Sequence, residues 1–261
     1  MNVSVSRYFY LRKNWRIVSF KKFYRKLSFI SSTDRNPDRL YSLIKKLTEI
    51  STDHLTPEIQ LRLITSDCYL WHSKVEDCLF SDPYWAFYWP GGQSLARFLL
   101  DNSGIIKHQS VLDLGSGCGA LAIVSKLLGA SHVVANDIDP VAIAAIRMNS
   151  ALNNVTVNTD NRNLFHEKTL STNVVLLGDM LYDIGLTVNV ARWMKNLPNN
   201  TLVLIGDPGR SESHLYLSKM NFKKVVEYEL TPTAKMENNG IHSSSVWIWE
   251  RWRASPFVEK I

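Results

Sequence analysis

The sequence contains few cysteines. Its 261 residues include three, Cys68, Cys78 and Cys118, and their spacing is not that of a metal-binding pair. An odd number of cysteines also gives no disulfide framework. The histidines form no metal-ligand pattern either. We therefore expect no metal site, and a reducing compartment or an organelle matrix is compatible with the chain.

Long apolar runs are also absent. No segment approaches the ~18 consecutive apolar residues of a membrane-spanning helix, so an integral membrane protein is not expected. Acidic residues are missing from residues 1–33, which hold eight basic ones. Since the whole chain carries a net charge of +6, the remainder has a slight acidic excess. We therefore expect no tight binding to nucleic acid.

The basic N-terminal segment has an amphipathic pattern. Ile17, Phe20, Tyr24 and Leu27 follow helical spacing, and the basic side chains occupy other faces. Acid-free, serine-containing segments of this kind are typical of mitochondrial transit peptides. A nucleic-acid-binding arm and a membrane-surface helix are the alternatives. We predict a transit peptide over about residues 1–33 and a mitochondrial matrix location.

The most informative segment is a strand that ends in alternate glycines. Residues 111–114 are apolar except for Asp113, and Gly115, Gly117 and Gly119 follow before an apolar helix. Glycines permit a sharp turn and close approach of a ligand to the backbone, and the first amides of a helix are free to donate. Such a turn suits either a dinucleotide or S-adenosylmethionine.

Asp113 distinguishes between these two ligands. The glycines also satisfy the dinucleotide pattern G-x-G-x-x-G/A, so they do not decide by themselves. A carboxylate two positions before Gly115 would repel a pyrophosphate, whereas it attracts the α-ammonium of S-adenosylmethionine directly or through a water. We predict S-adenosylmethionine as the cofactor, bound by Asp113, Gly115, Gly117 and Gly119.

A second carboxylate follows the next predicted strand, residues 132–136. Asp137 lies about twenty residues after the glycine turn, as a ribose-binding acid does. Asp139 precedes Pro140 and is better suited to cap the next helix. We therefore assign the ribose contact to Asp137 and the cap to Asp139.

Two further residues are candidates for the cofactor site. Asn161 follows a presumed strand near residues 155–157 and could bind the adenine amino group, with Asp160 as its rival. Trp89 belongs to a crowded aromatic run that we expect to be mostly packing. It precedes a Pro-Gly-Gly sequence where the backbone can approach a ligand. We nominate Trp89 as a residue that lines the cofactor.

Apolar runs alternate with helical patterns in the second half of the chain. This alternation predicts an α/β fold with a mostly parallel sheet that is covered on both faces. Two late strands joined by a polar loop are also expected. The expected strands span residues 111–114, 132–136, 174–178, 201–206, 223–230 and 245–250, with a helix at 94–100.

The region before residue 80 has helical features. Leu40–Ile50 has helical spacing, and Thr56–Glu58 contains a cap, a first-turn proline and an early acid that predict a helix over Ile59–Ile64. We therefore expect an N-terminal helical extension over residues 34–80 and a catalytic domain over residues 81–261.

The motifs resemble those of the class I, seven-β-strand S-adenosylmethionine-dependent methyltransferases, in which an acid and an apolar residue precede G-x-G-x-G. The resemblance covers about residues 80–250. Four segments together resemble the electron transfer flavoprotein β-subunit lysine methyltransferase family: Ser81–Gln93, Ala135–Pro140, Gly178–Asp183 and Gly206–Arg210. The resemblance implies a Rossmann-like sheet of seven strands that ends in an antiparallel hairpin.

Asp179 and Tyr182 follow the strand at 174–178, at the edge where open α/β sheets bind ligands. In the related protein methyltransferases a D-x-x-Y arrangement here is associated with the substrate lysine. The resemblance implies that Asp179 orients the amine, or serves as a general base, and that Tyr182 adds a hydrogen bond or a ring face. A helix cap and a packed aromatic are the structural alternatives. Met180 and Leu181 replace the prolines expected in nucleobase methyltransferases.

The resemblance also implies a function. The expected enzyme is a mitochondrial protein-lysine methyltransferase that modifies the β subunit of electron transfer flavoprotein and weakens its electron transfer with dehydrogenases. A ribosomal-protein or RNA methyltransferase of the same fold is one alternative, and a noncatalytic assembly factor is another. We assign no chemical role to Gly206–Arg210, which the resemblance places at the mouth of the site.

Overall fold

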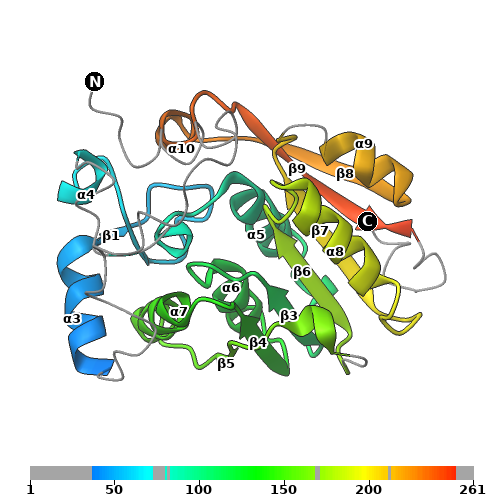
Figure 1. The fold of residues 1–261 in the computed structure, drawn as a ribbon, viewed down its shortest axis with the longest axis horizontal. Helices are drawn as coiled ribbons and strands as arrows, with labels where there is room; N and C mark the ends of the chain where they lie inside the picture. The colour runs from blue at the N-terminus through cyan, green and yellow to red at the C-terminus, as the bar shows by residue number, and fades with distance from the viewer. Residues whose placement is uncertain (1–36, 73–79, 81–82, 168–170, 211–212, 251–261) are drawn as a thin grey trace, which may run out of the picture.

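The structure is a computed structural model that describes residues 37–72, 80, 83–167, 171–210 and 213–250. The predicted transit peptide, residues 1–33, lies outside these ranges. A seven-stranded sheet forms the centre, with strand order β5-β4-β3-β6-β7-β9-β8 (Figure 1). Its strands are β3 (Ser110–Leu114), β4 (His132–Asn136), β5 (Asn158–Asp160), β6 (Val174–Gly178), β7 (Leu202–Asp207), β8 (Phe222–Glu229) and β9 (Ser243–Trp249).

Strands β3 to β7 are parallel to one another, whereas β9 pairs antiparallel with both β7 and β8. The predicted α/β fold with a mostly parallel sheet and a final antiparallel pair is therefore confirmed. Every parallel strand delivers its carboxyl end to the same edge of the sheet, which is the edge that binds ligands in open α/β folds.

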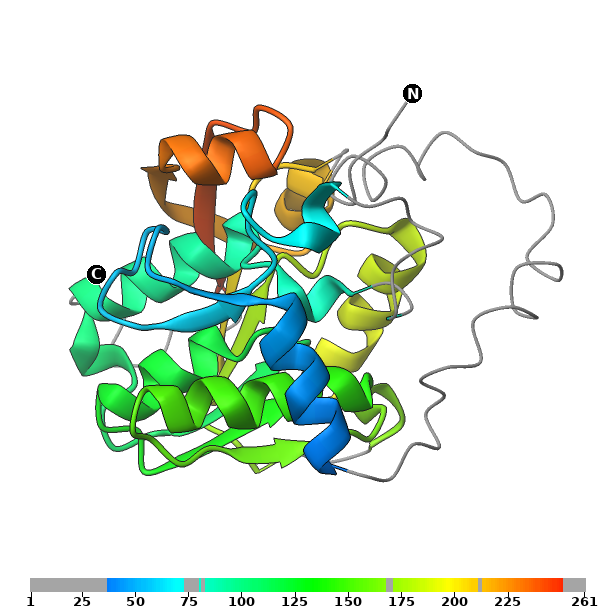
Figure 2. The ribbon, with the colours of Figure 1, turned by 90° about the vertical axis from the view of Figure 1, so that its left-hand side faces the viewer.

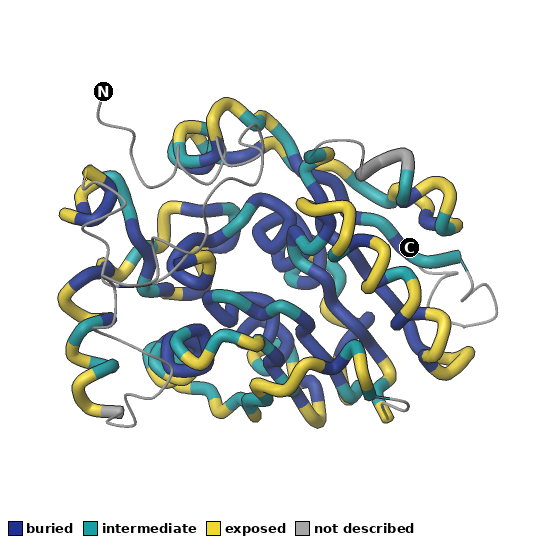
Figure 3. The backbone as a smooth tube through the Cα atoms, viewed as in Figure 1, coloured by how far each residue is buried: buried dark blue, intermediate teal, exposed yellow. Residues whose placement is uncertain are grey.

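Helices cover both faces of the sheet (Figure 1). On one face lie α5 (Pro90–Asp101), α6 (Ala120–Leu127) and α7 (Pro140–Leu152), and on the other α8 (Ile184–Met194) and α9 (Ser213–Lys219). Strand β6 shows the alternation that results: Leu176 packs into the core beneath α5 and α6, and Leu177 packs against α8. Buried residues accordingly concentrate along the central strands (Figure 3).

The N-terminal extension contains α3 (Pro37–Leu47), β1 (Glu49–Ser51), β2 (Leu61–Leu63) and α4 (Tyr69–His72). Helix α3 crosses over α7 (Figure 2). The helix predicted for Ile59–Ile64 is wrong, because this segment contains β2, which pairs antiparallel with β1. Thr56 begins only a single turn, and Leu61 and Leu63 then alternate into the core as a strand does.

Two glycines bring α5 into backbone contact with the sheet. A Cβ atom on Gly91 would lie 2.2 Å from the carbonyl oxygen of Gly206, and one on Gly206 would meet the carbonyl oxygen of Gly91 even more closely. No larger residue fits at either position without displacement of the backbone. The first turn of α5 therefore lies against the carboxyl ends of β6 and β7.

The connection between β8 and β9 contains α10 (Pro232–Glu237), which Thr231 caps through its hydroxyl. Three short 3₁₀ helices complete the described elements: η3 (Tyr84–Ala86), η4 (Ser103–Ile105) and η5 (Leu164–His166). Helix α10 and η3 matter for function, because residues beside each of them contact the site described next.

Candidate active site

Four aspartates lie at the carboxyl edge of the sheet. Asp113 is the penultimate residue of β3, Asp137 follows β4, Asp179 follows β6, and Asp207 ends β7. Three of them, Asp113, Asp179 and Asp207, are buried. Burial of carboxylates requires compensating hydrogen bonds or charges. The parallel topology thus brings together side chains that are far apart in the sequence.

The glycine turn between β3 and α6 has the conformation that its sequence predicts. Gly115, Gly117 and Gly119 have φ angles of 68°, 54° and 86°, in the left-handed region that favours glycine. A Cβ atom on Gly115 would also lie 2.2 Å from the sulfur of Met180. The turn is therefore a backbone cradle, and the positive φ angle of Gly115 disfavours a larger residue at this position even if Met180 moves aside.

Asp113 lies beneath this cradle and is fully buried. Its Oδ2 accepts hydrogen bonds from the Ser116 hydroxyl and from the backbone N–H of Ala122, whereas Oδ1 has no hydrogen-bond partner among the described residues. Burial, reinforced by the charge of Asp137, raises the pKa of Asp113 to about 7. A cationic group or a bridging water would satisfy Oδ1, so the residues present fit the ammonium end of S-adenosylmethionine.

Asp137 is joined to the same turn. Its Oδ2 accepts a hydrogen bond from Gly117 N–H at 2.9 Å, and its Oδ1 accepts one from Asp139 N–H at 3.0 Å. Burial raises the pKa of Asp137 as well. Each carboxylate oxygen retains a second lone pair, which leaves acceptor capacity for a ribose hydroxyl. The ribose role stays a prediction, whereas the predicted cap is confirmed: Asp139 accepts from Val141 N–H.

Asn161 is exposed just beyond β5. Its rival, Asp160, is occupied by a bidentate pair with Arg162, whose closest N–O distance is 2.7 Å. The buried Asn136 side chain donates to the carbonyl oxygens of Asp160 and Arg162, and these bonds join the end of β4 to the segment that carries Asn161. The adenine contact of Asn161 stays a prediction, and the pairing of Asp160 favours Asn161 over its rival.

Asp179 does not cap a helix. Asp183 caps α8 instead, by accepting a hydrogen bond from Leu186 N–H. Asp179 has a φ angle of +59°, which is uncommon for a residue other than glycine, and its backbone N–H donates to Gly206 at 2.8 Å. Strained backbone of this kind clusters at functional sites. The carboxylate is buried and accepts a hydrogen bond from Gly91 N–H at the start of α5.

Arg210 is the principal residue that the sequence analysis missed. Its Nε donates to Oδ1 of Asp179 at 2.9 Å, and Nη2 donates to Oδ2 at 3.3 Å and to Asn238 at 3.2 Å. Its guanidinium carbon also lies 5.3 Å from the ring centre of Trp89. Gly206–Arg210 follows a strand, and this position indicated that the segment lies at the carboxyl edge of the sheet. Nothing in the sequence indicated that Arg210 pairs with Asp179.

The structure thus places Trp89 on the side of Asp179 and Arg210. Its indole N–H donates to the carbonyl oxygen of Tyr84 at 2.9 Å. A contact between Trp89 and the cofactor stays a prediction. Trp85 and Tyr88, from the same aromatic run, are buried in the core, as expected of packing residues.

Tyr182 lies between Asp137, beside the glycine turn, and Asp179. Its ring stacks on that of Tyr84 at 6.1 Å between centroids, and 42% of the residue is exposed. Partial burial, then Tyr84 and the carboxylates of Asp137, Asp183 and Asp179, raise the pKa of Tyr182 to about 12. The hydroxyl therefore stays protonated at neutral pH and can donate a hydrogen bond to a group held between Asp137 and Asp179.

The arrangement can hold a cationic ligand end at the glycine turn and present an amine to Asp179 and Tyr182. Within residues that the structure describes, His, Cys, Asp and Glu side chains form no group of three that could hold a metal ion. In the same described ranges, no helix is long and apolar enough to cross a bilayer.

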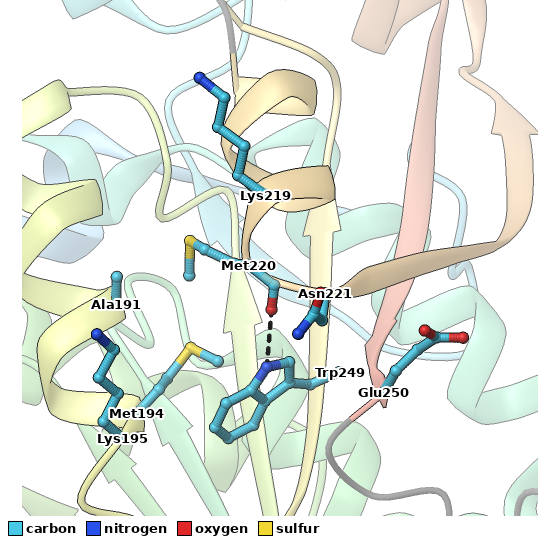
Figure 4. A pocket seen from close by; sticks show the side chains of 8 residues that line it. All are labelled: Ala191, Met194, Lys195, Lys219, Met220, Asn221, Trp249 and Glu250. Atoms are coloured by element: carbon cyan, nitrogen blue, oxygen red, sulfur yellow. Dashed lines mark hydrogen bonds between the residues drawn. The ribbon is translucent and has the colours of Figure 1, made fainter.

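A cavity of about 650 Å³ lies elsewhere, beside the ends of α8, α9 and β9 (Figure 4). Trp249, whose indole N–H donates to the carbonyl oxygen of Met220 at 2.9 Å, forms part of its wall. Because β9 is antiparallel to β7, Trp249 lies toward the amino-terminal edge of the parallel strands. The cavity is thus at the opposite edge from the four aspartates.

Comparison with known proteins gives a consistent result. Residues 95–191 match the family profile of ribosomal protein L11 methyltransferase (PrmA). The chain is 43% identical over 213 residues to the electron transfer flavoprotein beta subunit lysine methyltransferase of Mus musculus, which covers 80% of this chain and 84% of that protein. The protein of the same name from Homo sapiens is 45% identical over 210 residues, with coverage of 79% and 80%.

Among solved structures, a methyltransferase-type protein complexed with S-adenosylhomocysteine has a TM-score of 0.52. It is 11% identical, and the match covers 77% of this chain and 56% of that one. At this identity the likeness shows the fold alone.

Proposed function

The chain belongs to the electron transfer flavoprotein β-subunit lysine methyltransferase family, and we propose that it transfers methyl groups from S-adenosylmethionine to lysines of that subunit. The observation that carries the proposal is the identity of 43% and 45% to two such enzymes over about four fifths of the chain. The site supports it, because a cradle for a cationic cofactor lies beside residues suited to an amine.

S-adenosylmethionine supplies a methyl group on a positively charged sulfur, so the reaction needs no covalent intermediate on the enzyme. We propose that Asp113 and Gly115, Gly117 and Gly119 hold its amino-acid end. In the same proposal Asp137 holds the ribose, Asn161 contacts the adenine, and Trp89 lines the cofactor. The task of Asp179 and Tyr182 is then to orient the acceptor amine, and orientation with local electrostatics supplies the catalytic effect.

A second acceptor is favoured by one observation, the match of residues 95–191 to a ribosomal protein L11 methyltransferase profile. That range contains the glycine turn, Asp137, Asp179 and Tyr182, but it contains neither Trp89 nor Arg210. The profile therefore covers residues that we assign to both the cofactor and the acceptor, and it does not by itself decide between the two acceptors. The flavoprotein subunit remains our proposed acceptor, because the relatives named for it match on both sides of this range.

The test offers three acceptors to the purified full chain with labelled S-adenosylmethionine. The acceptors are the flavoprotein β subunit, ribosomal protein L11 and total RNA, each at equal mass. We expect label on lysines of the β subunit and none above background on the other two. Label confined to L11 or RNA would overturn the proposed acceptor, and a chain that binds the cofactor but labels nothing would support the noncatalytic alternative.

We also propose that the enzyme acts in the mitochondrial matrix, with residues 1–33 as its transit peptide. The basic, acid-free composition of this segment supports the proposal. Residues 1–33 fused to a fluorescent protein should direct it into mitochondria. A variant with all eight basic residues changed to glutamine is the matched control. Diffuse fluorescence from both fusions would contradict the proposal.

Methylation keeps the charge of lysine but adds bulk and removes N–H donors. We therefore propose that it weakens the docking of the flavoprotein on its dehydrogenases and slows their electron transfer. Stopped-flow measurement with unmethylated and enzymatically methylated flavoprotein tests this consequence. Equal rates and equal dehydrogenase affinities would contradict it without affecting the proposed reaction.

A further inference from the structure

Arg210 and Asp179 form a largely buried ion pair at the point where the acceptor amine is expected. Their side chains are 14% and 3% exposed, and the guanidinium contacts both carboxylate oxygens. We infer that Arg210 balances the charge of Asp179, so that the site receives the acceptor lysine as a neutral amine rather than as an ammonium. The inference rests on the proposed function, and it makes Arg210 a positioning residue for the reaction.

The need for such a device follows from the chemistry of lysine. With an unperturbed pKa near 10.4, only about 0.1% of the amine is neutral near pH 7.5. An ammonium has no lone pair with which to attack a methyl group. A buried carboxylate alone would stabilise the ammonium and so oppose the reaction. A carboxylate balanced by a guanidinium does not have this effect.

The pair can still orient the amine. Oδ1 accepts one hydrogen bond from Arg210, and Oδ2 accepts from Arg210 and from Gly91 N–H. Because each carboxylate oxygen has two lone pairs, Oδ1 retains capacity for an N–H of the amine. The pair therefore fixes the direction of the amine through a hydrogen bond, and the guanidinium offsets the charge by which Asp179 alone would favour protonation of the amine.

The second contacts of Arg210 hold it in this position. Its Nη2 donates to Asn238, which follows α10, and its guanidinium lies over Trp89, which precedes α5. Asn238 is buried and is itself anchored, since its amide donates to the carbonyl oxygen of Ala234. Two elements distant in the sequence thus fix the guanidinium where it meets Asp179.

Among the described residues, the elements around the pair carry several acidic groups and one further cation, Lys235 of α10, which is paired with Glu229. Asp183 and Asp137 act on Tyr182 beside Asp179. Asp207 ends the neighbouring strand β7, and Glu237 precedes Asn238 on α10. The first turn of α5 contributes no acidic side chain, and η3 contributes Tyr84. Within the described ranges, the ion pair recorded for Asp179 is the one with Arg210.

The reaction step balances with this arrangement. The ammonium first loses a proton to solvent, and the lone pair of the neutral amine then forms the nitrogen–carbon bond. The carbon–sulfur bond breaks as this bond forms, and its electron pair stays on sulfur. The methylated product is cationic, and a second methylation requires loss of another proton to solvent. At no point does Asp179 need to take up a proton.

A cycle of four proteins tests the charge balance: wild type, Arg210→Gln, Asp179→Asn and the double variant. Initial rates with the flavoprotein β subunit are measured from pH 6.5 to 10. In each protein the rate should rise with pH, and we call this part of the pH–rate profile its rising limb. The site of Arg210→Gln has one more negative charge than the wild-type site, so its rising limb should shift by about one unit to higher pH. Its rate should then be about tenfold low at pH 7.5 and recover toward its plateau near pH 10.

Asp179→Asn should shift the rising limb in the opposite direction to Arg210→Gln, and in the double variant the two shifts should cancel. The rising limb of Asp179→Asn should move to lower pH, although its plateau rate is reduced because asparagine has one neutral acceptor oxygen in place of two charged ones. The double variant has the wild-type net charge, so its limb should return to the wild-type position. Arg210→Lys keeps the positive charge but loses the two-pronged hydrogen bonding of the guanidinium. Its rising limb should therefore lie at the wild-type pH.

Binding provides a second readout that does not depend on turnover. Affinity for the β subunit is measured at pH 7.5 with S-adenosylhomocysteine present. Arg210→Gln should bind the charged lysine several-fold more tightly than wild type while turning over more slowly. A role of Arg210 in structure alone would weaken binding, and it would lower the rate by the same factor at every pH.

An Arg210→Gln limb at the wild-type position, or a double variant whose limb stays displaced, would overturn the inference. Calorimetric titration with S-adenosylmethionine shows which variants are folded. If Arg210→Gln fails this control, the comparison of wild type, Arg210→Lys and the double variant still requires one common limb. A wild-type chain inactive on the β subunit would contradict the proposed function, whereas an active one with unshifted variants contradicts this inference alone.

Discussion

The site at the carboxyl edge of the sheet has two halves, a cofactor side around the glycine turn and an acceptor side around Asp179, and they are built in different ways. On the cofactor side, the hydrogen bonds join residues 3, 9 and 20 positions apart: Asp113 to Ser116 and to Ala122, and Asp137 to Gly117. On the acceptor side, Asp179 is bonded to Gly91 and Arg210, which are 88 and 31 positions away. The difference shows that the cofactor half is a local structure, whereas the acceptor half exists only in the complete fold.

This difference explains what could be predicted from the sequence. The alternation of strands and helices from residue 90 onward, the glycine turn and the cap at Asp139 follow from local patterns, and the structure confirms them. The strand presumed near residues 155–157 lies three residues later, at Asn158–Asp160. Asp113, Asp137 and Asp179 could be placed at one edge because parallel strands share their direction. The partner of Asp179 could not be predicted, because a strand order alone does not show which loop residue reaches which carboxylate.

The helix predicted for Ile59–Ile64 failed for a related reason. Its start signals at Thr56–Glu58 are real and form a turn. The following residues are drawn into a strand by long-range contacts, since Arg62 N–H donates to the side chain of Asn149 and Leu61 enters the main core. Tertiary packing thus overrode a local preference.

The largest expected effect concerns the acceptor half. Asp179→Asn should lower the methylation rate about 10²–10³-fold, as loss of a buried group that orients the reacting atoms does. Affinity for S-adenosylmethionine, measured by calorimetry, should change little. Asp183→Asn is the matched control, because asparagine also caps a helix well. Equal losses in the two variants would show that Asp179 has no special part in the reaction.

The junction of the two halves should be sensitive to a single methyl group. Gly91→Ala places a Cβ atom 2.2 Å from the carbonyl oxygen of Gly206 and 2.6 Å from the nitrogen of Asp179. We expect it to lower the free energy of unfolding by about 2–3 kcal/mol in urea titrations. Gly104→Ala, whose Cβ would meet nothing within 4 Å, should stay within about 0.5 kcal/mol of wild type.

On the cofactor side, two aspartates only two positions apart should behave differently. Asp137→Asn should weaken binding of S-adenosylmethionine about 10- to 100-fold in calorimetry, because it removes a charged hydrogen-bond acceptor. Asp139→Asn keeps a good helix cap and should change the affinity less than about threefold. The ribose assignment fails if Asp139→Asn proves the more damaging of the two.

Affinity for the cofactor should also depend on pH through Asp113, whose pKa is about 7 in the free protein. A bound ammonium favours the ionised carboxylate, so affinity should rise between pH 6 and 7.5 by up to about tenfold. It should fall again above about pH 8, where the α-amino group of the ligand loses its proton. Asp113→Asn should abolish the rise, and a flat wild-type profile would contradict the assignment.

The same carboxyl has the opposite effect on the ligand-free fold. Because burial raises its pKa above the unfolded value, the folded state disfavours the ionised form. The free energy of unfolding should therefore decrease as pH rises from about 4 through 7. Asp113→Asn should remove this contribution, and urea titrations at several pH values measure it.

The smallest effect is expected at the boundary between the halves. Tyr182→Phe removes one hydroxyl and should lower the methylation rate about three- to tenfold, with the ring stack intact. Tyr84→Phe keeps the same stack and removes a hydroxyl that we assign no role, so its rate should stay near wild type. A larger loss in Tyr84→Phe would place the functional hydroxyl on the other ring.

The most direct test of the central claim is tandem mass spectrometry of the flavoprotein β subunit after incubation with the full chain and S-adenosylmethionine. We expect methyl groups on lysine side chains of the β subunit after incubation with wild type, and at most a trace of them with Asp179→Asn. A β subunit that stays unmodified while the wild-type chain binds the cofactor and methylates another macromolecule would contradict it.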